Sequence, residues 1–570
     1  MKTFRKFYEI DWPLCEEAVY RIQCDIAKAW MAGHHAHAAQ LQDTLVRTFE
    51  ARALAVKKVW TNPGSKTPGL DGVVWQNDAD LMEAVGTLRD LSAYTPMPVK
   101  RVYIPKARGG RRPLGIPTLY DRAVQTIFTL ALMPIAECEA DRRSYGYRPY
   151  KSAHDAATYL KLVLGAKYAK RWVLEADIEM FFDSLSHEWL LQNIPMNPKV
   201  LKKFLKAGFM ELPHPEVHET PGGTPQGGAI SPVLANMALN GLEQALGDAF
   251  RVVRFADDFV VIGASKEALH DRALPVVRAF LQPRGLTLAA AKTAITPIER
   301  GFDFLGLTFR EYKDDARAVG YKQGIFLVTP SKASVLAFKK RLKQAIKSLH
   351  KHSARAVIIK VNPMLRGWAQ YYKPFTSKKV FSALGHYVWT LLWRWCRKKH
   401  PTMPLRVLRS KYFKREGGNH WVFYARDSKH RTITLVQLGW IKIVRHTLCA
   451  DLNPFRPGNI EYYRRRRKRG ATPRASLNAN QTNLLKKQRG TCPVCHGDLL
   501  NGEPLEVHHI HPRNAGGKDT LRNLLVLHAF CHKQITYAKS PALKAAWVKA
   551  GIVKDLGPSR RPSGGSPGSK

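Results

Sequence analysis

The chain has 570 residues, enough for three to five domains of roughly 100–200 residues each. Its 91 lysines and arginines outnumber 45 aspartates and glutamates, so the formal net charge is +46, while hydrophobic residues make up 45% of the chain. This composition excludes wholesale disorder, and no run has the length and apolarity of a transmembrane helix. The basic excess indicates a large polyanion as partner, because each Lys or Arg on a phosphate releases a condensed counterion.

The N-terminal residues meet acidic side chains too early for a secretory signal. The eight cysteines are scattered apart from one cluster near the C-terminus, which is typical of a reducing cytosolic compartment. We therefore expect a cytoplasmic protein without a disulfide framework.

Residues 1–60 show helical spacing of apolar positions and are predicted to form helices broken at Gly33. From about residue 100 to 310, short β-rich runs alternate with helical stretches such as 118–138 and 231–247. The β-rich runs are VYIP (102–105), RWVLEADI (171–178), VVRFADDFVVI (252–262) and FDFLGLTF (302–309). This alternation predicts a mixed sheet with packed helices.

The second half of the chain changes character. Residues 330–400 are helical and basic, and YYRRRRKRG (462–470) has the composition of a basic linker. Residues 490–535 form a compact Cys/His-rich unit, and the last twenty residues have the composition of a disordered tail.

Two adjacent aspartates, Asp257 and Asp258, interrupt the apolar run VVRFADDFVVI. In a continuous strand they would point to opposite faces, whereas a hairpin turn would bring both to one edge. Asp177 ends the run RWVLEADI in the same way. Three carboxylates at one place would suit Mg²⁺ and a two-metal phosphoryl-transfer site; the alternative is a partly exposed strand end with solvated carboxylates.

Basic and glycine-rich segments accompany these aspartates. The segment IPKARGGRRPLGIP (104–117) carries Lys106, Arg111 and Arg112 around a Gly-Gly turn, as expected for a basic hairpin over a nucleoside triphosphate. Between the two aspartate runs, TPQGGAISPVLAN (224–236) is a glycine turn that leads into a helix.

In this order the segments resemble the successive blocks of the reverse transcriptase encoded by bacterial group II introns. The matching blocks are GLDG (69–72), RRPLGIP (111–117), SYGYRP (144–149), DIEMFFD (177–183), TPQGGAISP (224–232), RFADD (254–258), LAAAKT (288–293) and GFDFLG (301–306). The resemblance spans about residues 60–310 and implies a right-handed polymerase with fingers and palm.

The resemblance also implies site residues. Asp177, Asp257 and Asp258 would bind the catalytic Mg²⁺ pair, and Phe182 would stack under the incoming sugar and exclude a ribose 2′-hydroxyl. Contacts with the incoming dNTP would come from Gln226 near the nucleotide and from Lys106 and Arg112 at its triphosphate. Asp183 is interpreted as a structural acid, and Phe255 replaces the tyrosine usual before ADD, which we expect to alter fidelity or rate at most.

The basic helical middle has Lys339, Lys340, Arg341, Lys343 and Lys347 on one predicted helix. In the two segments that follow, LRGWAQYYKPF (365–375) and VWTLLWRWCRKKHP (388–401), aromatic residues alternate with basic ones. This arrangement is typical of nucleic-acid binding, although most of the rings are predicted to be helix core. The region resembles the thumb and maturase domain of intron proteins, which binds intron RNA, and residues 411–480 resemble a DNA-binding segment.

The Cys/His-rich unit contains a C-x-x-C pair and an H-x-x-C pair. Cys492, Cys495, His528 and Cys531 are predicted to hold a structural tetrahedral Zn²⁺, since so small a unit has little core of its own.

The remaining histidines and an asparagine resemble the HNH nuclease motif, a ββα-metal fold. The resemblance implies that His508 and His532 ligate Mg²⁺, His509 deprotonates the attacking water and Asn523 orients the His509 loop. His511 lies one position off the pattern. The alternative is a zinc-held DNA-binding module that has lost cleavage.

We therefore expect an α+β multidomain protein: a helical extension (1–60), fingers and palm (61–315), a helical thumb and maturase domain (316–410), a basic DNA-binding segment and linker (411–480), an HNH unit (481–550) and a tail (551–570). It would bind group II intron RNA, promote splicing, nick target DNA and reverse-transcribe the intron in a bacterial cytoplasm. A splicing factor with vestigial enzyme sites and a reverse transcriptase of a defence or diversity-generating system are the alternatives. Both a monomer and a homodimer are compatible with the sequence.

Overall fold

The computed structural model describes residues 6–105, 110–166, 168–313, 324–426, 430–470, 479–501, 503–537 and 540–554. Among these residues, none of the helices is both long enough and apolar enough to cross a membrane.

The N-terminal part is helical, as predicted. The elements are η1 (Phe7–Glu9), α1 (Trp12–Met31), α2 (His35–Arg47), α3 (Phe49–Thr61), η2 (Pro63–Lys66) and α4 (Asp78–Thr87). The break between α1 and α2 falls at Gly33, whose φ of +78° lies in the left-handed region that glycine adopts without steric cost. The side chains of Asp11 and Thr48 cap α1 and α3, respectively, because each accepts a hydrogen bond from a backbone N–H group of the first turn.

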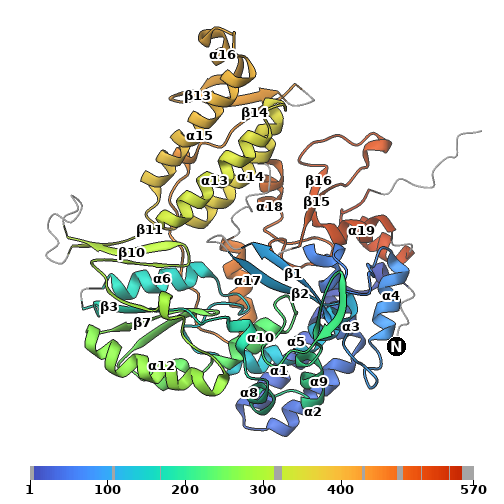
Figure 1. The fold of residues 1–570 in the computed structure, drawn as a ribbon. Helices are drawn as coiled ribbons and strands as arrows, with labels where there is room; N and C mark the ends of the chain where they lie inside the picture. Colours follow the sequence, from blue (N-terminus) through green and yellow to red (C-terminus); the bar gives the residue numbers. More distant parts are fainter. Residues whose placement is uncertain are drawn as a thin grey trace, which may run out of the picture.

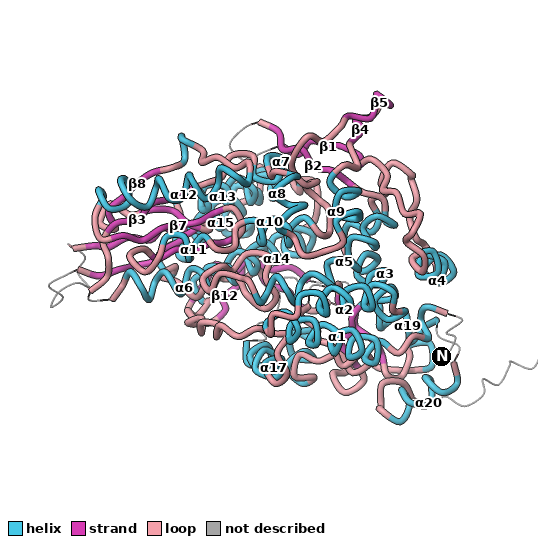
Figure 2. The backbone as a smooth tube through the Cα atoms, turned by 90° about the horizontal axis from the view of Figure 1, so that it is seen from below, coloured by secondary structure: helices cyan, strands magenta, loops and turns pink. Residues whose placement is uncertain are grey.

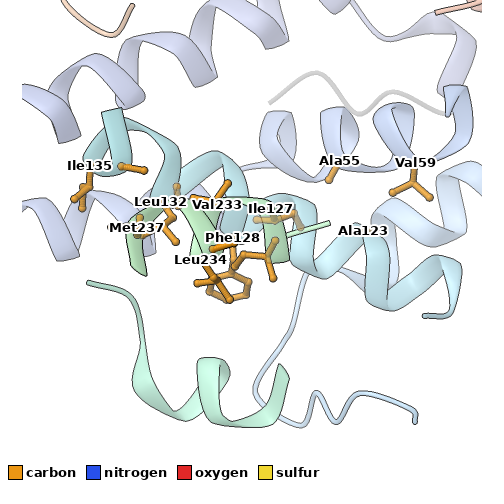
Figure 3. Close-up of a cluster of buried hydrophobic side chains, with 14 of the residues drawn as sticks. Ala55, Val59, Ala123, Ile127, Phe128, Leu132, Ile135, Val233, Leu234 and Met237 are labelled. Carbon is orange, nitrogen blue, oxygen red and sulfur yellow. The ribbon is translucent and has the colours of Figure 1, made fainter. Parts of the chain in front are cut away.

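A long apolar helix, α5 (Leu119–Cys138), is the centre of the main core. Its buried side chains pack between α3 and α10 (Ser231–Ala238), as Figure 3 shows for Phe128, Leu234 and Val59. The predicted helix 231–247 is in fact two helices, because Gly241 at φ +89° separates α10 from α11 (Leu242–Leu246).

The fingers sheet has the strand order β2-β1-β4-β5 and is mixed. Its strands are β1 (Val99–Pro105), β2 (Arg111–Ile116), β4 (Phe209–Glu211) and β5 (His214–His218). Strand β1 pairs antiparallel with β2 and parallel with β4.

The palm sheet has the order β6-β7-β3-β8, with every neighbouring pair of strands antiparallel. One isolated parallel bridge, between Ser144 and Arg254, lies at its β6 edge. Its strands are β3 (Trp172–Ala176), β6 (Arg251–Phe255), β7 (Asp258–Gly263) and β8 (Ala294–Pro297). Helices α6 (Ala153–Leu164) and α12 (Leu274–Leu281) cover opposite faces (Figures 1 and 2). Neighbouring strand residues therefore enter different cores: Val173 joins one and Leu174 the other.

Shorter elements complete the fingers and palm. They are α7 (Phe181–Ser184), α8 (His187–Asn193), α9 (Pro198–Leu205), η3 (Ala268–Ala273), η4 (Gln282–Arg284) and η5 (Ala290–Lys292). A three-stranded sheet of β9 (Phe302–Phe304), β10 (Leu307–Tyr312) and β11 (Ile325–Pro330) connects the palm to the next helices.

Three long helices, α13 (Lys332–Ser348), α14 (Ala354–Tyr372) and α15 (Lys378–Lys399), stand on the palm as a bundle (Figure 1). Trp368 and Tyr372 are buried, and Trp389 and Trp393 are half-buried with both rings 5.5 Å from that of Trp421. The core interpretation of these rings is confirmed. Helix α16 (Leu405–Tyr412) leads into the sheet β12 (Phe413–Glu416), β13 (Asn419–Arg426) and β14 (Thr432–Thr434), followed by η7 (Leu438–Trp440).

The run YYRRRRKRG is not a linker but lies within helix α17 (Asn459–Gly470), which docks on the palm. Tyr463 is buried and stacks on Tyr150 with ring centroids 4.5 Å apart. Arg466 donates to the buried carboxylate of Asp155 at 2.7 Å. For residues 462–470 the linker prediction is wrong, because this ring contact and ion pair are made with residues some 300 positions earlier in the chain. The stretch 471–478 that follows lies outside the described residues.

The C-terminal unit, defined here as the described residues within 479–554, contains α18 (Ala479–Lys487), β15 (Leu505–His509), η8 (Arg513–Ala515), β16 (Leu524–His528), α19 (Ala529–Tyr537) and α20 (Pro541–Lys549). The two strands pair antiparallel, with His509 opposite Leu524. Figure 1 shows α19 beside the blue N-terminal helices.

Candidate active sites

A hairpin turn carries Asp257 and Asp258. Phe255 at the end of β6 pairs with Asp258 at the start of β7, which leaves Ala256 and Asp257 as a two-residue loop. Ala256 has a φ of +58°. Of the two arrangements compatible with the sequence, the hairpin is therefore the correct one. A Cβ on Gly146 would lie 2.2 Å from the Ala256 nitrogen, so the SYGYRP segment approaches this turn as closely as only glycine permits.

A buried arginine lies behind the turn. Arg254 is 1% exposed, and its guanidinium donates to Asn236 Oδ1 at 3.1 Å, Asn240 Oδ1 at 3.0 Å and the Ala256 carbonyl at 3.4 Å. Asn236 Nδ2 donates in turn to the Gly146 carbonyl at 2.7 Å. Burial lowers the pKa of Arg254 to about 10, so it stays charged at neutral pH. This network fixes the turn against α10 and the SYGYRP segment.

Asp177 faces the turn from β3. Ala176 pairs with Phe259, so continuing the antiparallel register places Asp177 opposite Asp258. Its backbone carbonyl accepts from Ala289 N at 2.8 Å, and its carboxylate pairs with the ammonium of Lys292. The structure thus brings together the three aspartates that the sequence singled out.

The electrostatics of these carboxylates favour a cation. Desolvation, then repulsion from Asp257 and Asp177, raises the pKa of Asp258 to about 6, although the residue is exposed at the turn. The pKa of Asp257 is also raised, first by desolvation and then by Asp177, while Arg112 and Lys292 lower it. Like charges held together in this way are the donor set that a divalent cation compensates. Mg²⁺, whose ligands are carboxylates, water and phosphate oxygens, fits this set.

The ligand atoms of these three carboxylates lie farther apart than those of a preformed, closed metal site. Within the described ranges, the one group of at least three Cys, His, Asp or Glu ligand atoms lying within 4.8 Å of one another is in the C-terminal unit. In the palm, Lys292 holds the Asp177 carboxylate as an ion pair. Ligation of a cation by all three aspartates would have to displace this lysine.

Two of the expected nucleotide contacts lie close together. Arg112 Nε donates to Gln226 Oε1 at 2.6 Å, and Gln226 Nε2 donates to Asp183 Oδ2 at 3.3 Å. Asp183 thus makes a structural contact of the kind interpreted from the sequence. Lys106 lies outside the described residues.

Phe182 and Gln226 line one cavity of about 220 Å³ between fingers and palm. The Phe182 ring is 6% exposed and meets the ring of Tyr147 edge-on, with centroids 6.4 Å apart. Desolvation and the nearby charge of Asp257 raise the pKa of Tyr147. Tyr147, whose ring contacts Phe182 of the cavity lining, thus lies near the aspartate turn.

The Cys/His cluster of the C-terminal unit is preformed. The ligand atoms of Cys492, Cys495, His528 and Cys531 lie within 4.8 Å of one another, and all four residues are buried. His528 Nε2 lies 3.0 Å from the Asp498 carbonyl, so a proton on Nε2 leaves Nδ1 directed at the sulfurs. All eight cysteines of the chain are free thiols. Three thiolates and one imidazole fit tetrahedral Zn²⁺.

His508 and His532 meet across β15 and α19. Their ring centroids are 5.3 Å apart, and His532 Nδ1 lies 2.6 Å from Glu506 Oε2. Burial, followed by the charge of His532, lowers the pKa of His508 to about 4. A neutral imidazole is the form that can ligate a metal, so His508 fits the ligand role expected of it.

His509 has a carboxylate partner. Its Nε2 lies 2.9 Å from Asp519 Oδ1, which also accepts from Arg513 Nε at 2.8 Å. Asn523 Oδ1 accepts from His511 N at 2.8 Å, and its Nδ2 donates to the carbonyls of His511 at 3.0 Å and Lys518 at 2.9 Å. Asn523 thus holds the loop after His509, the contact that its expected role requires.

A cavity of about 760 Å³ opens onto these residues. It is lined by His508, His509, Asp519 and His532 from the C-terminal unit and by Arg431 from the segment between β13 and β14. The cavity is lined by imidazoles, a carboxylate and arginine, which suits a phosphodiester bound to a cation.

Family models match four consecutive parts of the chain. They are the N-terminal domain of reverse transcriptase (residues 7–88), the reverse transcriptase or RNA-dependent DNA polymerase itself (104–309), the maturase-specific domain of group II introns (335–413) and the HNH endonuclease (492–537). Protein YkfC of Escherichia coli is 34% identical over 312 residues, which is 46% of this chain and 81% of YkfC. The chain belongs to the group II intron-encoded reverse transcriptase/maturase family.

A second relative of this group II intron-encoded protein is LtrA of Lactococcus lactis, 36% identical over 200 residues. That match covers 34% of this chain and 32% of LtrA, so the chain spans about a third of that relative. Among solved structures, the match to telomerase from Candida albicans covers 54% of this chain and 63% of the telomerase chain. Its sequence identity is 13% and its TM-score is 0.31.

Several residues around the sites of this intron-encoded protein were not singled out by their sequence pattern. Arg254 and Asn236 lie inside quoted blocks, yet their burial behind the turn depends on packing between blocks. Lys292 is the fifth residue of the LAAAKT block, and Asp519 lies two positions after a Gly-Gly pair. A lone acidic residue after Gly-Gly, ten positions beyond a His-His pair, is the kind of signal that could have identified Asp519.

Proposed function

We propose that this protein binds its group II intron RNA, promotes splicing, nicks a target DNA with its HNH unit and extends the resulting 3′-hydroxyl by copying the RNA into DNA. The observation that carries the proposal is the hairpin turn that presents Asp257 and Asp258 opposite Asp177. This arrangement supports phosphoryl transfer by a polymerase rather than RNA binding alone. A bacterial cytoplasm, with association to the nucleoid when the protein is on DNA, is the location we propose.

At the polymerase site, Asp177, Asp257 and Asp258 would hold Mg²⁺. When bound, this ion supplies Lewis-acid activation of the primer 3′-hydroxyl and neutralises charge on the departing phosphates. Arg112 and Lys106 would bind the triphosphate of a dNTP, with Gln226 beside the nucleotide. Phe182, packed against Tyr147, would lie under the sugar and leave no room for a 2′-hydroxyl.

At the nuclease site, His509 would accept the proton of the attacking water, and Asp519 would hold the imidazole in orientation. His508 and His532 would hold Mg²⁺, and Asn523 would fix the loop that carries His509. Zn²⁺ in the Cys492, Cys495, His528 and Cys531 cluster would be structural, since all four coordinating positions come from the protein.

The bundle α13–α15 and the preceding domains would bind the intron RNA. Lys340, Arg341, Lys343 and Lys347 are exposed along α13, whereas the aromatic rings of the bundle are mostly internal. Contacts to the RNA backbone and shape would therefore dominate over base stacking in this region.

Splicing tests the part of this proposal that rests most on family membership. RNA transcribed from the DNA that flanks the gene is incubated at moderate Mg²⁺ with and without the protein, at a salt concentration high enough to suppress nonspecific phosphate binding. Protein-dependent joining of exons supports the maturase role. Unchanged splicing alongside active primer extension on a generic template would contradict it and favour a free-standing reverse transcriptase.

A further inference from the structure

One aromatic side chain of the C-terminal unit is enclosed by the N-terminal segment. Phe530 of α19 is 1% exposed and meets four rings at centroid distances of 5.9 Å (Phe7), 5.8 Å (Tyr8), 5.2 Å (Trp12) and 5.7 Å (Trp60). These rings come from η1, α1 and α3, more than 450 residues earlier in the chain. A fully enclosed aromatic anchor is the feature that distinguishes a specific interface from incidental packing.

Polar contacts surround this anchor. Gln534 Nε2 donates to the buried Tyr8 carbonyl at 2.8 Å. Lys57 Nζ lies 5.3 Å from the Phe530 ring and 4.8 Å from the Trp12 ring, and it pairs with Glu16 at 3.3 Å. Lys533 Nζ lies 4.4 Å from the Trp60 ring. The rings bury apolar area, and the two lysines over them add cation–π contacts that restrain the geometry of the interface.

The anchor belongs to the same turn of chain as the metal ligands. Phe530 lies between His528 and Cys531, both members of the buried Cys/His cluster, and α19 begins at Ala529. The position of the Phe530 ring is therefore set by the cluster that Zn²⁺ fits. A change in that cluster would reach the N-terminal segment through Phe530 and through the α19 residues that follow it.

From these contacts we propose that the Phe530 cage is a zinc-dependent latch that fastens the nuclease unit to the N-terminal helices of the polymerase. With the latch closed, nuclease and polymerase act as one body, so a nicked 3′-hydroxyl is extended without release of the DNA. Without the latch, each activity persists, but the two no longer act on one DNA molecule in sequence. The latch does not depend on the proposed function, whereas its effect on the coupling of nicking to extension rests on that function.

The test alters the polymerase side of the contact and leaves the nuclease unit and its ligands unchanged. Trp60→Ala opens the cage, and Lys57→Met removes its cation. Trp30→Ala is the matched control, since Trp30 is a half-buried tryptophan of the same helices whose ring packs on His35 at 4.2 Å and has no ring contact with Phe530. Hydrogen exchange of residues 7–12 and 529–537 reports the latch directly, and bound zinc is measured in parallel.

We expect both latch variants to keep their zinc and to raise amide exchange in residues 7–12 and 529–537 at least about fivefold, with no change in Trp30→Ala. Chelation of zinc from the wild-type protein should raise exchange in residues 7–12 as well. Unchanged exchange in those residues after either treatment would overturn the latch.

Coupling is measured by supplying DNA to be nicked together with excess unlabelled primer–template as a trap. The latch variants should nick and extend separately within about twofold of wild type and lose most of the trap-resistant extension. Trap-resistant extension at the wild-type level would overturn the coupling. A wild-type protein that neither nicks nor extends would overturn the proposed function, while the exchange measurement would still decide the latch.

Discussion

Asn236 and Arg254 are joined by a hydrogen bond of 3.1 Å directly beneath the turn that carries Asp257. Asn236 also donates to the Gly146 carbonyl, so one amide connects α10, the palm strand β6 and the SYGYRP segment. The buried guanidinium of Arg254 donates hydrogen bonds to amide and carbonyl oxygens at this position. The rigidity of the aspartate turn therefore depends on a neutral amide and a buried cation.

Replacement of Asn236 should destabilise the palm. In Asn236→Ala a buried guanidinium N–H and the Gly146 carbonyl lose their partner, which should cost about 2–3 kcal/mol in the free energy of unfolding. Urea denaturation followed by tryptophan fluorescence measures this. The control is Asn193→Ala at an exposed position of α8, which should change stability by less than about 0.5 kcal/mol. Equal stability of the two variants would contradict the proposed role of Asn236.

Protons should compete with Mg²⁺ at the aspartate turn. Desolvation and the charges of Asp257 and Asp177 raise the pKa of Asp258 to about 6, so below pH 6 this ligand is protonated. Primer extension at low Mg²⁺ should increase as the pH rises through about 6, and a higher Mg²⁺ concentration should move the midpoint to lower pH. A midpoint that is independent of Mg²⁺ concentration would contradict ligation by Asp258.

The same pKa shift affects stability in the presence of a chelator. Because the folded-state pKa of Asp258 exceeds its usual value of 3.8, the folded protein binds more protons than the unfolded chain between these two values. The Asp258 contribution to stability therefore decreases as the pH rises from about 4 to about 6. Asp258→Asn should remove this part of the pH dependence, as a comparison of unfolding midpoints at pH 5 and 7 would show.

Loss of the Cys/His metal should unfold the C-terminal unit and spare the polymerase. Cys495→Ser removes one of four buried ligands, and a unit of this size has little other core. We expect loss of bound zinc and of DNA nicking, with extension of a preformed primer retained. Proteolysis should then cleave within residues 479–554 first. Retention of zinc and nicking by this variant would contradict the ligand assignment.

The nuclease residues should separate by role. His509→Ala removes the proposed general base and should lower nicking by about 10²–10⁴-fold. Asp519→Asn keeps the shape but weakens the charge-assisted contact with His509, so nicking should fall about tenfold. Primer extension by the same preparations serves as the internal control. Nicking at the wild-type rate in His509→Ala would contradict the general-base assignment, and a folded wild-type protein that binds DNA without nicking it would favour a DNA-binding module over a nuclease.

The sequence predicted the palm well because its signals are local. Carboxylates in apolar runs identified Asp177, Asp257 and Asp258, and the β-rich runs correspond to strands of the structure. Whether Asp257 and Asp258 share an edge depended on a turn that the sequence left open. The hairpin at Ala256 decided it.

Features made by distant residues were not predictable in the same way. In sequence, the basic run within α17 resembles a linker. In the structure, Tyr463 stacks on Tyr150 and Arg466 donates to Asp155. From the sequence, Phe530 is expected to be an ordinary core residue of a small domain. The rings that it contacts in the structure lie in the first sixty residues. Charge and hydrophobicity along the chain give no signal for such pairings, because they are decided by packing between domains.

RNA-templated primer extension tests the central claim most directly. A DNA primer annealed to an RNA template is incubated with dNTPs and Mg²⁺, and the full-length protein is compared with Asp257→Asn, which removes one proposed metal ligand. We predict extension by the wild-type protein and a rate at least about 100-fold lower in the variant, with an unchanged thermal midpoint of unfolding within a few degrees. Equal extension by the two proteins, or none by a folded wild-type protein, would contradict the assignment of this turn as the polymerase site.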